Sequence, residues 1–173
     1  INSETGNLNW SQNSDYPFNS QIKFYKDKFF VVNYKNALKC FYINDGRECW
    51  KVQTDESFTV SNSKYSILIK DNLLIFNNSI GDITAVDIIS GLIEWQQPTQ
   101  KSSITNEAYN FNFSKLVSDK DSIYFSNNKN EFYSIDIKTG TTNWINKINS
   151  NIRPILISNL IFTISNEGYL YVV

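Results

Sequence analysis

The sequence has no histidine, no methionine and only two cysteines among its 173 residues. Without histidine, the chain lacks the side chain that most often acts as a general base or metal ligand near neutral pH. Sixteen basic residues nearly balance 17 acidic ones, so no excess of positive charge indicates a nucleic-acid-binding surface. No apolar run approaches the roughly 18 residues of a membrane-spanning helix, and no signal-peptide pattern is present. Because methionine is missing and the chain starts within a turn, "INSETG", we expect a processed or excised piece.

What the sequence does contain is a repeated pairing of glycine with tryptophan. Each of the four tryptophans lies four residues after a glycine, in the segments "TGNLNW", "DGRECW", "SGLIEW" and "TGTTNW". These residues, Trp10, Trp50, Trp95 and Trp144, are separated by 40, 45 and 49 positions. A recurring period of this length indicates a repeat architecture, in which one structural unit is copied along the chain.

Between successive tryptophans the sequence repeats four short runs rich in Ile, Val, Phe, Tyr and Thr. One interval contains "YSILI", "LLIFN", "ITAVDI" and "LIEWQ", whereas the last part of the chain reaches only three runs. Such runs, broken by Asn, Asp and Gly, predict β-strands, and no sustained helical period competes with them. Four antiparallel strands per repeat are typical of a β-propeller blade. A sandwich of unrelated hairpins is the alternative, but it would not place a glycine four residues before every tryptophan.

We therefore predict an all-β propeller of four-stranded antiparallel blades, about four blade-equivalents in a single domain over 1–173. The blade boundaries that we expect are a blade end at 1–14, blades at 20–55, 64–98 and 114–148, and a partial blade at 152–173.

The turn before each tryptophan suggests what the tryptophan does. In "SIDIKTGTTNW", Asp136 can accept backbone N–H bonds within the turn, and Gly140 supplies the positive φ that the hairpin needs. Trp144 then falls on the outermost strand, where its ring can cover the seam between neighbouring blades. Because burying an indole is worth about 2–3 kcal/mol, we expect these rings to join blades rather than to stack on a ligand.

The pattern Ala-x-Asp-x-x-x-Gly-x-x-x-Trp resembles the tryptophan-docking motif of quinoprotein-type propellers, the PQQ-like repeat. It is complete at Ala85, Asp87, Gly91 and Trp95. Three further copies are partial. Asp136, Gly140 and Trp144 match, with Ser134 in place of the Ala. Gly46 and Trp50 match, but Cys40 and Tyr42 replace the Ala and the Asp, and the third copy keeps only Asn2, Gly6 and Trp10. The resemblance implies an internal segment of about half an eight-bladed ring, the usual blade number in this family. We expect such a half-ring to be poorly stable as a monomer.

Two classes within this family imply different functions. Quinoprotein dehydrogenases bind PQQ with Ca²⁺ through inward-facing carboxylates, and many carry adjacent cysteines, whereas Cys40 and Cys49 are nine residues apart here. BamB-type lipoproteins of the outer-membrane assembly machinery are non-catalytic. The segments "SFTVSNSKYS", "IEWQQ" and "SNEGYLYVV" resemble that second class in family order. We therefore expect a BamB-type scaffold without cofactor, metal or catalytic residues, and keep a quinoprotein dehydrogenase, active or degenerate, as the alternative.

The BamB-type resemblance implies a partner, a location and contact residues. The partner is the periplasmic part of a BamA-type barrel insertase, with unfolded outer-membrane proteins as possible clients. The location is the periplasm of a Gram-negative bacterium, with membrane attachment only through a lipid anchor that this chain does not contain. Two loops carry the contact in the family. They correspond here to Phe58, Val60 and Ser61, with Ser in place of an Arg, and to Asn110 and Asn112, with Asn in place of acidic residues. Ordinary solvated loops are the alternative interpretation of both segments.

The two cysteines flank the "INDG" turn. A four-residue loop would pair Tyr42 with Arg47 and place Cys40 across from Cys49, where a disulfide could form if the geometry permits. Two reduced, half-buried thiols are the expectation that we favour.

Overall fold

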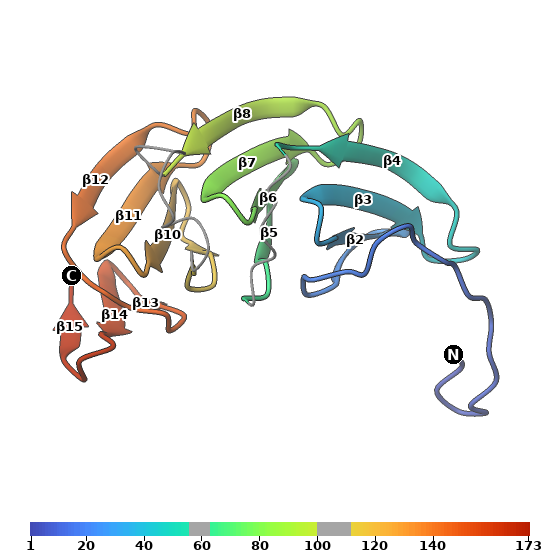
Figure 1. The fold of residues 1–173 in the computed structure, drawn as a ribbon, viewed down its shortest axis with the longest axis horizontal. Helices are drawn as coiled ribbons and strands as arrows, with labels where there is room; N and C mark the ends of the chain where they lie inside the picture. The colour runs from blue at the N-terminus through green and yellow to red at the C-terminus, as the bar shows by residue number, and fades with distance from the viewer. Residues whose placement is uncertain (56–62, 100–111) are drawn as a thin grey trace.

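The computed structural model describes residues 1–55, 63–99 and 112–173, which form fifteen strands and no helix. The strands make three four-stranded sheets and one three-stranded sheet, each antiparallel and ordered as in the sequence. Figure 1 shows the sheets fanned around an arc, with β4, β8 and β12 along its outer rim. The chain is therefore an all-β propeller segment that covers part of a ring, as the sequence predicts.

Each sheet is one blade. The first blade contains β1 (Lys23–Tyr25), β2 (Lys28–Val32), β3 (Ala37–Tyr42) and β4 (Glu48–Gln53). The second contains β5 (Ile67–Lys70), β6 (Leu73–Asn77), β7 (Asp82–Asp87) and β8 (Ile93–Pro98). The third contains β9 (Val117–Ser118), β10 (Ser122–Asn127), β11 (Glu131–Asp136) and β12 (Thr142–Asn146). The fourth contains only β13 (Ile155–Ile157), β14 (Leu160–Ile164) and β15 (Leu170–Val172).

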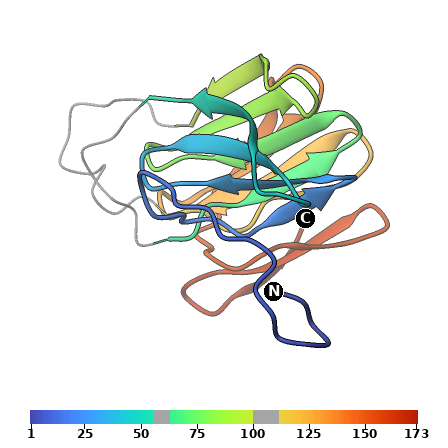
Figure 2. The ribbon, with the colours of Figure 1, turned by 90° about the vertical axis from the view of Figure 1, so that its right-hand side faces the viewer.

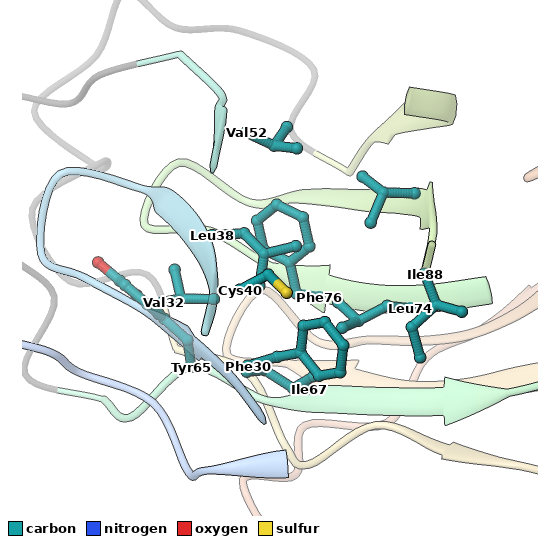
Figure 3. Close-up of a cluster of buried hydrophobic side chains, with 11 residues drawn as sticks. Phe30, Val32, Leu38, Cys40, Val52, Tyr65, Ile67, Leu74, Phe76 and Ile88 are labelled. Atoms are coloured by element: carbon teal, nitrogen blue, oxygen red, sulfur yellow. The ribbon is translucent and has the colours of Figure 1, made fainter. Parts of the chain in front are cut away.

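The hydrophobic core lies in the seams between blades. In the first seam, Phe30 and Leu38 of the first blade meet Ile67, Leu74 and Phe76 of the second, all at 0–1% exposure (Figure 3). A second cluster joins the second and third blades, and a smaller one joins the third and fourth. Because each fully buried Leu, Ile or Phe is worth about 1.5–3 kcal/mol, the blades depend on their neighbours for most of their apolar burial.

A β-bulge recurs where the third strand of each complete blade pairs with the fourth. The register shifts by one residue between Cys40 and Phe41, and it shifts at the same place in the second and third blades. The shift sets the docking tryptophan opposite the small residue of the motif, so that Cys40 faces Trp50 and not Cys49. The predicted pairing of Cys40 with Cys49 is therefore wrong, because counting from the turn does not include the extra residue. The structure has both cysteines as free thiols, Cys40 buried and Cys49 half-buried.

Candidate partner-binding surface

The turn between the Asp and the Gly of each motif, called the docking turn below, is held by hydrogen bonds between residues close in sequence. The Asp87 carboxylate accepts backbone N–H bonds from Ile89 (3.1 Å) and Ser90 (2.7 Å). Asp136 accepts from Lys138 and Thr139 in the same way, at 3.0 and 2.8 Å. These donors stabilise the ionised form and lower the pKa of both carboxyl groups. Asp87 and Asp136, both half-buried, thus have a structural function in shaping the turn.

Each turn receives the tryptophan of the preceding blade. A Cβ added to Gly140 would lie 2.6 Å from the Trp95 ring, and the same approach is 2.7 Å for Gly91 with Trp50 and for Gly46 with Trp10. Since these three glycines also have φ of +70 to +75°, only glycine fits. The Trp95 indole N–H donates to the Ile137 carbonyl at 2.9 Å, which fixes the ring across the seam.

The indole N–H groups differ in their hydrogen bonds. Trp10 donates to the Ile43 carbonyl at 2.8 Å, the position equivalent to the acceptor of Trp95. The Trp50 N–H is buried without a partner among the described residues. Trp144 packs on Phe132 (5.9 Å between ring centroids) and Tyr124 (6.0 Å) at the seam with the incomplete fourth blade. Trp10, Trp50 and Trp95 thus each contact the glycine turn of the next blade, whereas the ring contacts of Trp144 are to residues of its own blade.

Sequence reasoning missed a second repeated device, an asparagine turn between the second and third strands. Asn33 Oδ1 accepts backbone N–H bonds two and four residues further on, and so do Asn78 and Asn127. These asparagines are separated by 45 and 49 residues, the steps that also separate the last three tryptophans. That shared spacing is the signal that could have found them.

Most of the predicted partner-contact residues lie outside the described part of the chain. Phe58, Val60, Ser61 and Asn110 belong to the segments 56–62 and 100–111, on which the structure gives no description. Asn112 is described and half-buried, and its side-chain oxygen accepts a hydrogen bond from the Ser63 hydroxyl. Its backbone N–H donates to the Asn128 side chain at 3.1 Å. Asn112 therefore links the start of the second blade to the third.

The residues that flank these two segments are held by a buried polar network. Asn36, with no exposed surface, donates to the Asp55 carbonyl and to the Ser79 hydroxyl, both at 2.9 Å. Tyr133 donates to the Thr99 carbonyl at 3.2 Å. The Asn36–Ser79 and Tyr133–Thr99 hydrogen bonds cross from one blade to the next, whereas the Asn36–Asp55 bond lies within the first blade. Asp55 and Thr99, the described residues that precede the segments 56–62 and 100–111, are therefore each hydrogen-bonded to a blade.

Burial raises the pKa of two side chains near these hydrogen bonds, Asp82 and Tyr133. Burial raises the pKa of Asp82, whose carboxylate accepts a 2.8 Å hydrogen bond from Gln96. Burial, with the Glu131 carboxylate 2.8 Å from the hydroxyl, raises the pKa of Tyr133. Asp82 joins β7 to β8 through Gln96, and Tyr133 pairs with Glu131 of its own strand.

The inner strands line a hollow of about 670 Å³ on the concave side of the arc. Its lining includes Lys23 of β1, Lys115 just before β9 and Arg153 just before β13. Burial, together with Lys64 and Lys23 nearby, lowers the pKa of Lys115. Among residues 1–55, 63–99 and 112–173, no group of three His, Cys, Asp or Glu side chains is arranged to hold a metal ion. Nor do those residues form a helix long and apolar enough to cross a bilayer.

Comparison with known proteins identifies relatives of this architecture. The profile of a family described as outer membrane protein assembly factor BamB matches residues 1–173. No curated protein matches the chain. The crystal structure of BamB from Moraxella catarrhalis superposes with a TM-score of 0.82 at 16% identity, covering 99% of this chain and 53% of that one. The chain thus spans about half the length of that structure.

Two further structures show how widely the fold is shared. The computationally designed Ika4 protein has a TM-score of 0.72 at 14% identity, covering 98% of each chain. Quinohemoprotein alcohol dehydrogenase ADHIIG from Pseudomonas putida HK5 has a TM-score of 0.64 at 14% identity, covering 83% of this chain and 22% of that one. At these identities the likenesses show the fold alone.

Proposed function

The chain belongs to the family of outer membrane protein assembly factor BamB, and from this premise we propose that it is a non-catalytic scaffold which binds the periplasmic domains of a BamA-type barrel insertase. The family match carries the proposal, because it extends over all 173 residues and not over a single motif. The proposed location is the periplasm, at the outer membrane.

The proposed contact surface is the pair of segments 56–62 and 100–111 with their flanking residues. Phe58 and Val60 supply apolar groups, and Ser61, Asn110 and Asn112 supply neutral hydrogen-bonding groups. The hydrogen bonds that hold Asp55 and Thr99, the residues preceding the two segments, support this role, since ordered flanking residues lower the ordering cost of binding. These five positions carry no formal charge, so they would contribute apolar burial and neutral hydrogen bonds to the contact.

Binding of the purified chain to the immobilised periplasmic domains of the BamA-type protein from the same organism tests the proposal. We expect saturable binding, and the double variant Phe58→Asp/Val60→Asp should weaken it at least about tenfold, since charges at an apolar contact remain unpaired. Ile89→Asp is the matched control, because Ile89 is 59% exposed in the docking turn, at the opposite end of β8 from residue 99. Absence of binding by the folded parent chain would refute the scaffold proposal.

One observation favours the alternative, a quinoprotein dehydrogenase. The concave hollow gathers Lys23, Lys115 and Arg153, and PQQ is an anion whose carboxylates such cations can bind. Titration of PQQ with Ca²⁺ into the chain separates the two functions. Saturable binding that Lys115→Ala and Arg153→Ala abolish would favour the enzyme, whereas the scaffold proposal expects no saturable binding.

A further inference from the structure

The first strands of the four blades bring equivalent residues to one hollow. In the first blade, Lys23 lies opposite Phe30, three residues before the turn that begins at Asn33. The same pairing, three residues before the corresponding turn, selects one residue in each of the other blades. The residues at this position are Lys23, Leu68, Val117 and Ile155, and those two positions earlier are Gln21, Ser66, Lys115 and Arg153. Both sets line the hollow of about 670 Å³ on the concave side of the arc.

Side chains at these two positions point to the same side of each first strand, because residues two apart along a strand share a face. Figure 1 shows β5 and β13 on the concave side of the arc, and Figure 2 shows the strands of neighbouring blades running in similar directions. β1 is in contact with β5, and β9 with β13. Lys115 and Arg153, which lie two residues before the ends of these pairings, therefore reach the hollow from adjoining strands.

Positive charge is concentrated in this hollow. Lys23, Lys115 and Arg153 line it, and no Asp or Glu of the described ranges does. The whole chain has a net charge of −1, so the concentration does not reflect an overall excess of basic residues. In the part of the chain that the structure describes, ion pairs are formed by Lys39 and Arg47, and none is formed by the three cations of the hollow.

Lys115 is held in place beside the other cations. Its ammonium group donates to the Lys64 carbonyl at 3.1 Å. Burial lowers the pKa of Lys115, and the positive charges of Lys64 and Lys23 lower it further. An anion in the hollow would offset this repulsion, since a nearby negative charge favours the protonated form of lysine.

The arrangement of the cations favours a phosphoryl group over a carboxylate. Lys23, Lys115 and Arg153 come from the first, third and fourth blades, whereas the two coplanar oxygens of a carboxylate can be satisfied by a single Arg side chain. A phosphoryl group has three acceptor oxygens that point in different directions, and it carries close to two negative charges.

The size and the remaining lining of the hollow indicate an organic ligand. Its volume of about 670 Å³ lies within the range of roughly 300–1,000 Å³ that is typical of small-molecule sites. Leu68 and Leu156, both half-buried, contribute apolar surface to it. A phosphate ion alone would leave this apolar surface without a contact.

We propose that the hollow binds a phosphate monoester. The phosphoryl oxygens contact Lys23, Lys115 and Arg153, and the organic group lies against Leu68 and Leu156. The scaffold function does not require this ligand, so the two proposals stand or fall separately. PQQ carries its charge on carboxylates, so a preference for phosphate also distinguishes this site from a quinone cofactor site.

Isothermal titration calorimetry of the purified chain with phenyl phosphate, in buffer without Ca²⁺, tests the proposal. We expect saturable binding of one phenyl phosphate per chain. Phthalate, an aromatic dianion whose charges are both on carboxylates, should bind at least about tenfold more weakly, because its oxygens match the three cations less well. Inorganic phosphate should bind at least about threefold more weakly, because it has no apolar group to bury.

Two variants test whether the named cations form the site. Arg153→Gln and Lys23→Gln should each weaken the binding of phenyl phosphate at least about tenfold, because each removes a charged donor. The matched control is Lys51→Gln, which removes an exposed positive charge from β4 on the outer rim (Figure 1). It should change the affinity less than about twofold, because exposed charges at a distance are screened by salt. Circular dichroism spectra verify that each variant is folded.

The absence of saturable phenyl phosphate binding by the folded chain would overturn the proposal. Phthalate binding as tight as that of phenyl phosphate would overturn the preference for phosphate, and equally tight binding of inorganic phosphate would overturn the contact with an organic group. Equal losses of affinity in Lys51→Gln and Arg153→Gln would attribute the binding to overall charge and would overturn the assignment of the site.

Discussion

The contact of Gly140 with the Trp95 indole makes a quantitative prediction. Alanine at position 140 would keep a φ of +72°, which costs an L-residue about 1–2 kcal/mol. Its Cβ would also lie 2.6 Å from Cδ2 and Cε3 of the ring, and an overpacked site of this kind costs about 1–3 kcal/mol more. Gly140→Ala should therefore lower the free energy of unfolding by about 2–5 kcal/mol in total.

Urea unfolding followed by tryptophan fluorescence measures this loss. All variants should be compared at one chain concentration. Gly168→Ala is the control, because its φ is +91° but nothing lies within 4 Å of the added Cβ. It should show only the backbone cost, about 1–2 kcal/mol. Equal losses for the two variants would refute the inference that the indole at position 95 requires a glycine.

Three further predictions concern the indole hydrogen bond, the turn carboxylates and the thiols. Trp95→Phe should cost about 1–2 kcal/mol more than Trp50→Phe, because the described part of the chain gives a partner only to the Trp95 N–H of these two; equal urea midpoint shifts would contradict this. The folded pKa of Asp136 lies below its ordinary value of 3.8, so its contribution to stability is present above pH 3.8 and is lost as the pH falls further. Asp136→Asn should reduce the fall in the free energy of unfolding between pH 5 and 2, as measured by urea unfolding at each pH. An unchanged pH dependence would contradict the role of the Asp136 carboxylate in the turn. Iodoacetamide should modify Cys49 at least about tenfold faster than Cys40, because burial raises the pKa of the Cys40 thiol; equal rates by peptide mass mapping would contradict the observed burial.

The parts of the fold that could be predicted from the sequence are those encoded locally. The docking turn is made by bonds between residues at most five positions apart, such as Asp87 with Ser90 and Leu92, so its residues recur at fixed offsets. Trp95 lies opposite the small Ala85 on the neighbouring strand, and its large ring reaches Gly140 of the next blade. Repetition of this unit made the propeller fold predictable.

The parts that could not be predicted depend on register and on contacts between distant residues. A bulge adds one residue to the fourth strand, and no residue type at Cys49 indicates it, so Cys40 was placed opposite the wrong neighbour. The hydrogen bond of Asn36 to Ser79 joins positions 43 apart, which only the assembled seam brings together. The predicted contact residues Phe58 and Asn110 lie outside the described part of the chain and remain proposals.

A double-mutant cycle between Trp95 and Gly140 tests most directly whether the contact of an indole with the glycine of the next blade stabilises the fold. The free energy of unfolding would be measured for the parent, Trp95→Ala, Gly140→Ala and the double variant. With the ring removed, Gly140→Ala should cost only the strain of its φ, leaving a coupling energy of about 1–3 kcal/mol. Additive losses, with no coupling between the two positions, would contradict the account.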